Sequence, residues 1–253
     1  MLAAIRSACG VALLQAEVFP GVVMELDDTD YVDREILLNG AYETKTVALF
    51  DRLVRESTGF LDVGAHHGQY SLRAAKVLKK MSGKVTAFEP MPRNASRLLR
   101  NAELSGVTNL HLFTCALSDT YGVHGMSCPK ERNSGSARIS NSAAEGANSE
   151  SISVATAPFS AVISRIDSRA LDLVKIDVEG HEMRVISSLL EAAPSPPRNI
   201  LLEYIPASFD YGIAEGLPSW LQKKGYKLRD VEGNCFSEGM PLTDCNLWAS
   251  RMS

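Results

Sequence analysis

The chain has 253 residues, a length that fits one large α/β domain or one domain with an extension. Hydrophobic residues make up 45% of it, enough for a sizeable core, and the formal net charge is −4. A chain without a basic surplus is not typical of nucleic-acid binders, so we expect no nucleic-acid partner.

The N-terminal stretch Met1–Phe19 is rich in apolar residues, but Arg6 interrupts it and Glu17 closes it. A membrane-spanning helix needs about 20 apolar residues, so we expect no membrane span. We predict an amphipathic or buried helix here, with a targeting segment as the alternative. The five cysteines are scattered without a C-x-x-C pair, which favours free thiols in a reducing, cytoplasmic compartment.

Further along the chain, short apolar runs alternate with stretches of helical periodicity. Strands are predicted at Phe60–Val63, Val85–Phe88, Leu110–Cys115, Leu171–Ile176 and Ile200–Tyr204. Helices are predicted at Tyr70–Met81, Ala95–Ala102, Met183–Leu190 and between Pro218 and Gly225, followed by a closing strand pair, Tyr226–Val231 and Asn246–Ala249. This alternation predicts an α/β fold, Rossmann-like, with a mostly parallel sheet, an antiparallel closing strand and helices on both faces.

Two segments interrupt this alternation. Cys128–Ser153 is rich in Ser, Asn, Gly and Ala, and is predicted to be a flexible loop or flap. Pro194–Pro197 contains three prolines and predicts a break between a helix and a strand.

Sheets of this kind bind ligands beyond the carboxyl ends of their strands, so the residues that follow each strand are the candidate site. After the first strand come Asp62, Gly64, Ala65 and Gly68, in a G-x-x-x-G spacing that differs from the dinucleotide pattern G-x-G-x-x-G. Glycines let a ligand approach the backbone closely. Asp62 would repel a pyrophosphate and would suit a ligand with a cationic amino-acid end.

Glu89 follows the second strand, about 25 residues beyond the first glycine, near the offset at which an acid binds a ribose diol in this fold. A carboxylate accepts hydrogen bonds from both hydroxyls, and such charge-assisted bonds are strong. Ala116 and Leu117 follow the third strand, where an adenine would lie.

The fourth strand ends in a cluster of ionisable side chains, Asp177, Glu179, His181 and Glu182. Paired carboxylates and a histidine can form an acid–base site, and the same groups could bind a divalent metal. The structural alternative is that the two glutamates favour the start of the next helix. Glu203 closes the fifth strand and is expected near the same pocket.

These motifs resemble the FkbM family of methyltransferases over roughly Asp28–Ala249. The matching motifs, in chain order, are FLDVGAHHGQYS, KVTAFEPMPRN, CALSD, NSGSARI, LVKIDVEGHE and NILLEY. The resemblance implies a class I methyltransferase fold, with residues 1–50 as an extension or cap and 51–253 as the methyltransferase domain. One position departs from the family: His66 stands where asparagine is more common.

The resemblance implies S-adenosylmethionine as cofactor, with Asp62, Gly64 and Gly68 bordering its methionine end. Glu89 would bind the ribose, Ala116 and Leu117 would flank the adenine, and Asp177 would lie near the sulfonium. Members mostly methylate hydroxyl groups, so we expect O-methylation of a small molecule or sugar. Candidate catalytic bases are Glu179, His181 and Asp177, in that order, and a metal-assisted version would use the same cluster.

Three other readings remain open from the sequence. A nicotinamide-dependent oxidoreductase is disfavoured by Asp62 and by the absence of G-x-G-x-x-G. A methyltransferase acting on nucleic acid or protein is the second; the N/D-P-P-Y motif of nucleobase-methylating enzymes is absent after the fourth strand. A non-catalytic binding module that keeps the fold is the third.

Overall fold

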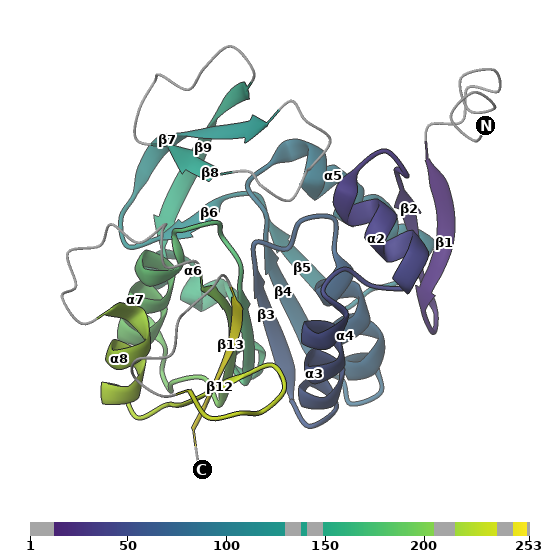
Figure 1. Ribbon diagram of the computed structural model, residues 1–253. Coiled ribbons are helices and arrows are strands. Elements are labelled where there is room, and N and C mark those ends of the chain that lie inside the picture. The colour runs from purple at the N-terminus through teal and green to yellow at the C-terminus, as the bar shows by residue number, and fades with distance from the viewer. Residues whose placement is uncertain (1–12, 130–137, 141–148, 205–215, 237–244, 252–253) are drawn as a thin grey trace.

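The computed structural model describes residues 13–129, 138–140, 149–204, 216–236 and 245–251. Its centre is a seven-stranded sheet in the order β12-β13-β11-β10-β3-β4-β5 (Figure 1). The strands are β3 (Gly59–Val63), β4 (Lys84–Phe88), β5 (Leu110–Phe113), β10 (Leu173–Ile176), β11 (Asn199–Tyr204), β12 (Lys227–Asp230) and β13 (Cys245–Ser250).

Strand β13 runs antiparallel to both of its neighbours, whereas β11, β10, β3, β4 and β5 pair in parallel. The predicted fold class, including the antiparallel closing strand, is therefore confirmed. The predicted strand bounds differ from the observed ones by two residues at two places and by one residue elsewhere. Leu171 belongs to a short 3-10 turn, and β5 ends at Phe113 before Cys115.

Helices cover both faces of this sheet (Figure 1). One face carries α3 (Thr44–Arg55), α4 (Gln69–Lys79) and α5 (Pro92–Leu104); the other carries α6 (Phe159–Val162), α7 (Glu182–Ala192) and α8 (Gly216–Lys223). The four predicted helices correspond to α4, α5, α7 and α8. The proline-rich break is also confirmed, because Pro194–Pro197 lies between the end of α7 and the start of β11.

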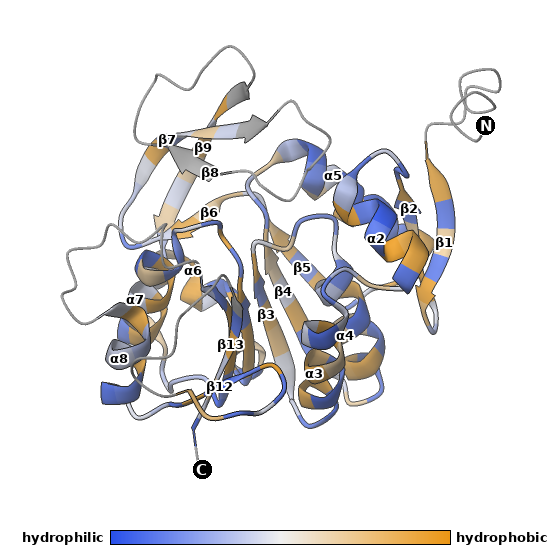
Figure 2. Ribbon diagram, in the orientation of Figure 1, coloured by the Kyte–Doolittle hydropathy of each residue, from blue (hydrophilic) through white to orange (hydrophobic). Residues whose placement is uncertain are grey.

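Successive side chains of each strand point to opposite faces of the sheet, which gives one hydrophobic core on each face. Phe60 and Leu173 pack with α3 and α4, whereas their neighbours Leu61 and Val174 pack with α7 on the opposite face. The central strands accordingly bury apolar residues on both faces, as expected for a covered parallel sheet. Figure 2 shows hydrophobic residues along these strands. Among the described residues, no helix is both long and apolar enough to span a membrane.

The N-terminal region forms a β-hairpin of β1 (Leu14–Phe19) and β2 (Val22–Leu26), followed by α2 (Tyr31–Asn39). The helix predicted over Met1–Phe19 is wrong for its last six residues; residues 1–12 lie outside the described part. In β1, half-buried residues alternate with exposed Gln15 and Glu17, which is the two-residue period of a strand. Asn101 of α5 and Ser105, which follows this helix, accept hydrogen bonds from backbone N–H groups of β2.

A second sheet, ordered β6-β9-β7-β8, lies beside the carboxyl ends of the central strands (Figure 1). It comprises β6 (Ala116–Ser118), β7 (Gly122–Pro129), β8 (Arg138–Ser140) and β9 (Ser149–Pro158). The loop predicted for Cys128–Ser153 is therefore wrong where β7, β8 and β9 enter it; residues 130–137 and 141–148 lie outside the described part. The prediction relied on the polar composition of this segment. Its strands are defined instead by backbone pairing between β7 and β9.

Candidate active site

A pocket opens at the carboxyl ends of β3, β4, β10 and β11, where ligand sites of this fold are expected. Its walls are the turn after β3, the residues Tyr42 and Glu43 ahead of α3, and Ala116, Leu117 and Met126 of the second sheet. The predicted site residues that line it are Gly64, Ala65, Glu89, Ala116, Leu117, Asp177, Glu179 and His181. Asp62 and Gly68 lie behind this wall.

The turn after β3 is fixed by its backbone. The N–H groups of Gly64 and Ala65 both donate to the carbonyl of Phe88, at 2.9 and 3.0 Å. Gly64 has a φ of +86°, and a Cβ at that position would lie 1.8 Å from the carbonyl oxygen of Asp177. Only glycine therefore lets the turn after β3 approach the end of β10 this closely. Gly68, with a φ of +100°, precedes α4 and packs against Leu72.

Asp62 points to the face of the sheet covered by α4. It is buried and accepts a 2.6 Å hydrogen bond from the hydroxyl of Ser71. Burial raises the pKa of Asp62 to about 6, although the charge of Lys175 opposes the shift. Asp62 does not line the pocket itself, and its contact with a ligand stays a prediction.

Lys175 reaches the pocket from the strand position beside Asp62. It is buried, its Nζ lies 2.5 Å from Oδ2 of Asp177, and it stands 4.6 Å above the ring of Tyr70. Burial lowers the pKa of Lys175, but the carboxylates of Asp177 and Glu43 outweigh it, so the pKa is raised and the amine stays charged. The sequence prediction missed this residue; the available signal was a lysine within an apolar strand.

Glu89 is oriented by two backbone donors. Its Oε2 accepts from the N–H of His66 and its Oε1 from the N–H of Met91, each at 2.8 Å. Burial raises the pKa of Glu89 to about 7, while these hydrogen bonds oppose the shift. The carboxylate therefore stands at the predicted place on the pocket wall in a fixed orientation.

His66 adopts a left-handed conformation with a φ of 51°. Asparagine tolerates this conformation better than most residues, which suits the asparagine that the resemblance implies at this position. Burial lowers the pKa of His66 well below its usual value, so the ring is neutral. Its ring lies 4.2 Å from that of His67.

His67 connects the turn to the N-terminal region. Its Nε2 lies 2.6 Å from Oδ1 of Asp33 on α2, and Oδ2 of Asp33 lies 2.5 Å from Nη2 of Arg97 on α5. Burial raises the pKa of Asp33, but hydrogen bonding to His67 and the charge of Arg97 prevail and lower it to about 2. This buried group could not be predicted from the sequence, because its members are far apart along the chain.

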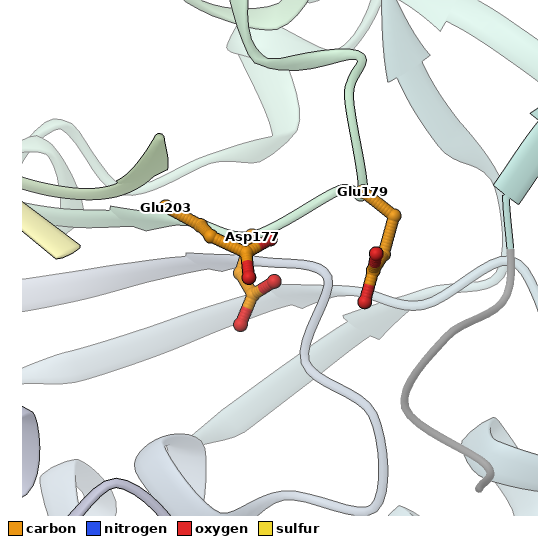
Figure 3. Close-up of side chains that lie close together, drawn as sticks. All are labelled: Asp177, Glu179 and Glu203. Atoms are coloured by element: carbon orange, nitrogen blue, oxygen red, sulfur yellow. The ribbon is translucent and has the colours of Figure 1, made fainter. Parts of the chain in front are cut away.

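Three carboxylates lie close together where β10 and β11 end at the pocket. Asp177 and Glu203 come from the ends of β10 and β11, and Glu179 from the loop after β10 (Figure 3). One oxygen of each lies within 4.8 Å of the others, a spacing that could also accommodate a divalent cation. Burial, with the neighbouring charges of Asp177 and Glu179, raises the pKa of Glu203 to about 9. Glu179 has a φ of 54°, a strained conformation of a kind that clusters at functional sites.

The two remaining members of the predicted cluster have different environments. His181 lines the pocket, and its Nε2 lies 2.9 Å from the hydroxyl oxygen of Ser118. Glu182 is buried and accepts hydrogen bonds from the N–H groups of Val178 and Gly180. The helix-start interpretation therefore holds for Glu182, whereas Glu179 and His181 face the pocket.

The sheet order, the glycine turn after β3 and the polar groups at the strand ends define a class I methyltransferase. A family model described as Methyltransferase FkbM domain matches residues 62–228, more than half of the chain. The chain therefore belongs to the FkbM family of S-adenosylmethionine-dependent methyltransferases, which confirms the resemblance seen in its motifs. No curated protein matches the chain at a significant level.

Solved structures with a similar arrangement include three methyltransferases. A methyltransferase FkbM from Methylobacillus flagellatus is 15% identical, with a TM-score of 0.47 over 77% of this chain and 44% of that chain. Precorrin-6y C5,15-methyltransferase from Geobacter metallireducens is 13% identical, with a TM-score of 0.46 over 81% and 88%. The SAH-bound Podospora anserina methyltransferase PaMTH1 is 11% identical, with a TM-score of 0.47 over 84% and 80%. The chain thus spans under half the length of the first of these.

Proposed function

We propose that this pocket binds S-adenosylmethionine and that the protein methylates a hydroxyl group of a small molecule or sugar. The observation that carries the proposal is the charge of the pocket wall. Five carboxylic residues line it against one lysine, Lys175; they are Glu43, Glu89, Asp177, Glu179 and Glu203. Glu203 is protonated at neutral pH, so the charge comes from the other four. Such a wall attracts a cation and opposes the pyrophosphate of a nicotinamide cofactor.

For each part of the cofactor, the pocket wall has the residues that the sequence predicts. The fixed carboxylate of Glu89 would accept hydrogen bonds from both ribose hydroxyls. Ala116 and Leu117 would flank the adenine. Gly64 and Ala65 would lie along the methionine end, with Asp62 and Gly68 supporting the turn from behind. Asp177 would lie near the sulfonium, where its charge is favourable.

When bound, S-adenosylmethionine supplies the methyl group on an electrophilic sulfonium. The protein then has to position the acceptor hydroxyl in line, and well-oriented groups can reach effective molarities of about 10⁵–10⁸ M. A base adds roughly 10²–10⁴-fold by taking the hydroxyl proton. Glu179, His181 and Asp177 are our candidates, and all three line the pocket.

Calorimetric titration with S-adenosylmethionine tests cofactor binding. Glu89→Gln keeps the shape of the side chain but removes the charge that binds the ribose, so we expect affinity to fall about 10- to 100-fold. Glu103→Gln is the matched control: this residue is exposed on α5, paired with Arg100, and its loss should leave affinity unchanged. Binding of NAD in preference to S-adenosylmethionine would contradict the proposal.

The acceptor class is tested by incubating the protein and methyl-labelled S-adenosylmethionine with hydroxylated metabolites and glycans. We expect label on oxygen of a small molecule or sugar. Parallel reactions with a chelator separate base catalysis from metal assistance by the trio Asp177, Glu179 and Glu203. Label found on protein, on nucleic acid or on nitrogen would overturn the proposed acceptor while leaving the cofactor assignment intact.

A further inference from the structure

A line of hydrogen-bonded side chains leads from the pocket to the protein surface. Nε2 of His181 lies 2.9 Å from Oγ of Ser118, and the same Oγ lies 3.1 Å from Oδ1 of Asp119. The carboxylate of Asp119 in turn accepts from Nη1 of Arg184, at 2.8 and 3.1 Å. We call these four residues the His181 relay. Ser118 is buried at its centre.

The protons available in the His181 relay determine which group donates in each hydrogen bond. A serine hydroxyl has one proton, and an ionised carboxylate can only accept. Burial raises the pKa of Asp119, but the hydrogen bond from Arg184 prevails and lowers it, so Asp119 is ionised. Ser118 therefore donates to Asp119, and its oxygen accepts from an N–H of His181.

The hydroxyl proton of Ser118 goes to Asp119, so only the oxygen of Ser118 remains for the ring of His181. A neutral imidazole carries one proton, and the bond to Ser118 places that proton on Nε2. The lone pair is then on Nδ1.

Nδ1 is not occupied by the neighbouring helix. His181 stands at the N-cap position of α7, yet its side chain makes no capping hydrogen bond. Glu182 performs that role instead, by accepting from the N–H groups of Val178 and Gly180. With the residues that the structure describes, the ring of His181 makes a hydrogen bond to Ser118 alone.

We infer that Ser118, Asp119 and Arg184 hold His181 as the Nε2–H tautomer, so that Nδ1 is the atom that takes the proton from the acceptor hydroxyl. This inference rests on the proposed O-methylation. The hydroxyl oxygen forms its bond to the methyl carbon while the carbon–sulfur bond breaks with its electron pair going to sulfur. The hydroxyl proton passes to Nδ1, and the imidazolium is stabilised by Asp119 through Ser118. His181 is then the catalytic residue, and the other three are positioning residues.

The tautomer can be measured without an acceptor. Long-range ¹H–¹⁵N correlation spectra of the ¹⁵N-labelled protein distinguish a protonated ring nitrogen from an unprotonated one, and His181→Gln identifies the signals of this ring. We expect protonated Nε2 and unprotonated Nδ1 at neutral pH. A proton on Nδ1 of the wild-type ring, or a ring charged at neutral pH, overturns the inference whatever the variants do.

Ser118→Ala removes the acceptor of the Nε2 proton. We expect the variant to show a mixture of both tautomers, Ser118→Thr to keep the wild-type pattern, and Ser187→Ala, a control on α7, to leave it unchanged. An unaltered tautomer in Ser118→Ala contradicts the positioning role. With an acceptor in hand, turnover should fall at least about tenfold in Ser118→Ala and recover in Ser118→Thr. Calorimetry with S-adenosylmethionine separately reports whether the proposed function itself has failed.

Discussion

At the scale of single residues, unusual backbone conformations are concentrated around the pocket. In the described part of the chain, four residues other than glycine have a positive φ, and three of them, Glu43, His66 and Glu179, line the pocket. Such conformations cost about 1–3 kcal/mol each and persist where surrounding structure enforces them. Gly64 belongs to the same pattern, since its φ of +86° allows the contact between the turn and β10.

Gly64→Ala should therefore destabilise the protein strongly. The new Cβ would lie 1.8 Å from the carbonyl oxygen of Asp177 and the residue would keep an unfavourable φ. We expect a loss of about 3 kcal/mol or more in the free energy of unfolding, measured by urea denaturation. Gly106→Ala is the control, because its φ is +59° but nothing lies within 4 Å of the new Cβ. It should lose only about 1 kcal/mol; equal losses in both variants would contradict the steric argument.

At the scale of elements, the N-terminal hairpin and α2 are tied to the candidate cofactor turn. The apolar side chains Val22, Met24 and Ile36 pack with Leu72 of α4 and Ala102 of α5. Asp33 of α2 adds the buried contacts to His67 and Arg97. We propose on this basis that residues before position 51 act as more than a cap, because they support the turn that would hold the methionine end of the cofactor.

Asp33→Ala tests this connection. The change leaves Arg97 buried without its carboxylate partner, so we expect a loss of about 3–5 kcal/mol in the free energy of unfolding. Glu35→Gln on the same helix, where the side chain bonds only to Asn39 among described residues, should change it by less than about 0.5 kcal/mol. Both are measured by chemical denaturation monitored by circular dichroism. A loss below about 1 kcal/mol for Asp33→Ala would show that α2 is held by its apolar face alone.

At the scale of the whole molecule, buried acids give the protein a characteristic pH dependence. Burial raises the pKa of Glu203 to about 9 and those of Glu89 and Glu182 to about 7. Unfolded glutamates titrate near 4.3, so between pH 9 and pH 7 the native state binds more protons than the unfolded state. Stability therefore increases as pH falls through this window. Below about pH 6.5 the neutral buried histidines oppose the trend, because they would be protonated in the unfolded chain.

We predict that the thermal midpoint of the ligand-free protein rises by roughly 3–10 °C between pH 9 and pH 7. Calorimetric scans across this range measure it. Glu203→Gln should flatten the profile, since it removes the group with the highest raised pKa, whereas Glu232→Gln, an exposed residue paired with Lys45, should leave it unchanged. A midpoint that stays constant or rises toward pH 9 is incompatible with buried, protonated acids.

Sequence alone determined the order of the elements and most of the pocket wall. Short apolar runs that end in a glycine or an acidic residue are local signals, so β3, β4, β10 and β11 could be predicted together with Gly64, Glu89, Asp177 and the residues that follow them. The antiparallel closing pair was also predictable. In the second sheet and in β1 the prediction failed because pairing with a partner strand, and not composition, defines the strands there.

Only the tertiary structure decided which side chains meet. The pairing of β3 with β10 places Asp62 and Lys175 side by side. Of these two, Lys175 lines the pocket and Asp62 does not. The packing of α2 against α5 brings Asp33 to His67 and Arg97, and the second sheet brings Ser118 to His181. These contacts join residues 30 to more than 60 positions apart, and their energies come from burial and charge, which the linear sequence does not specify.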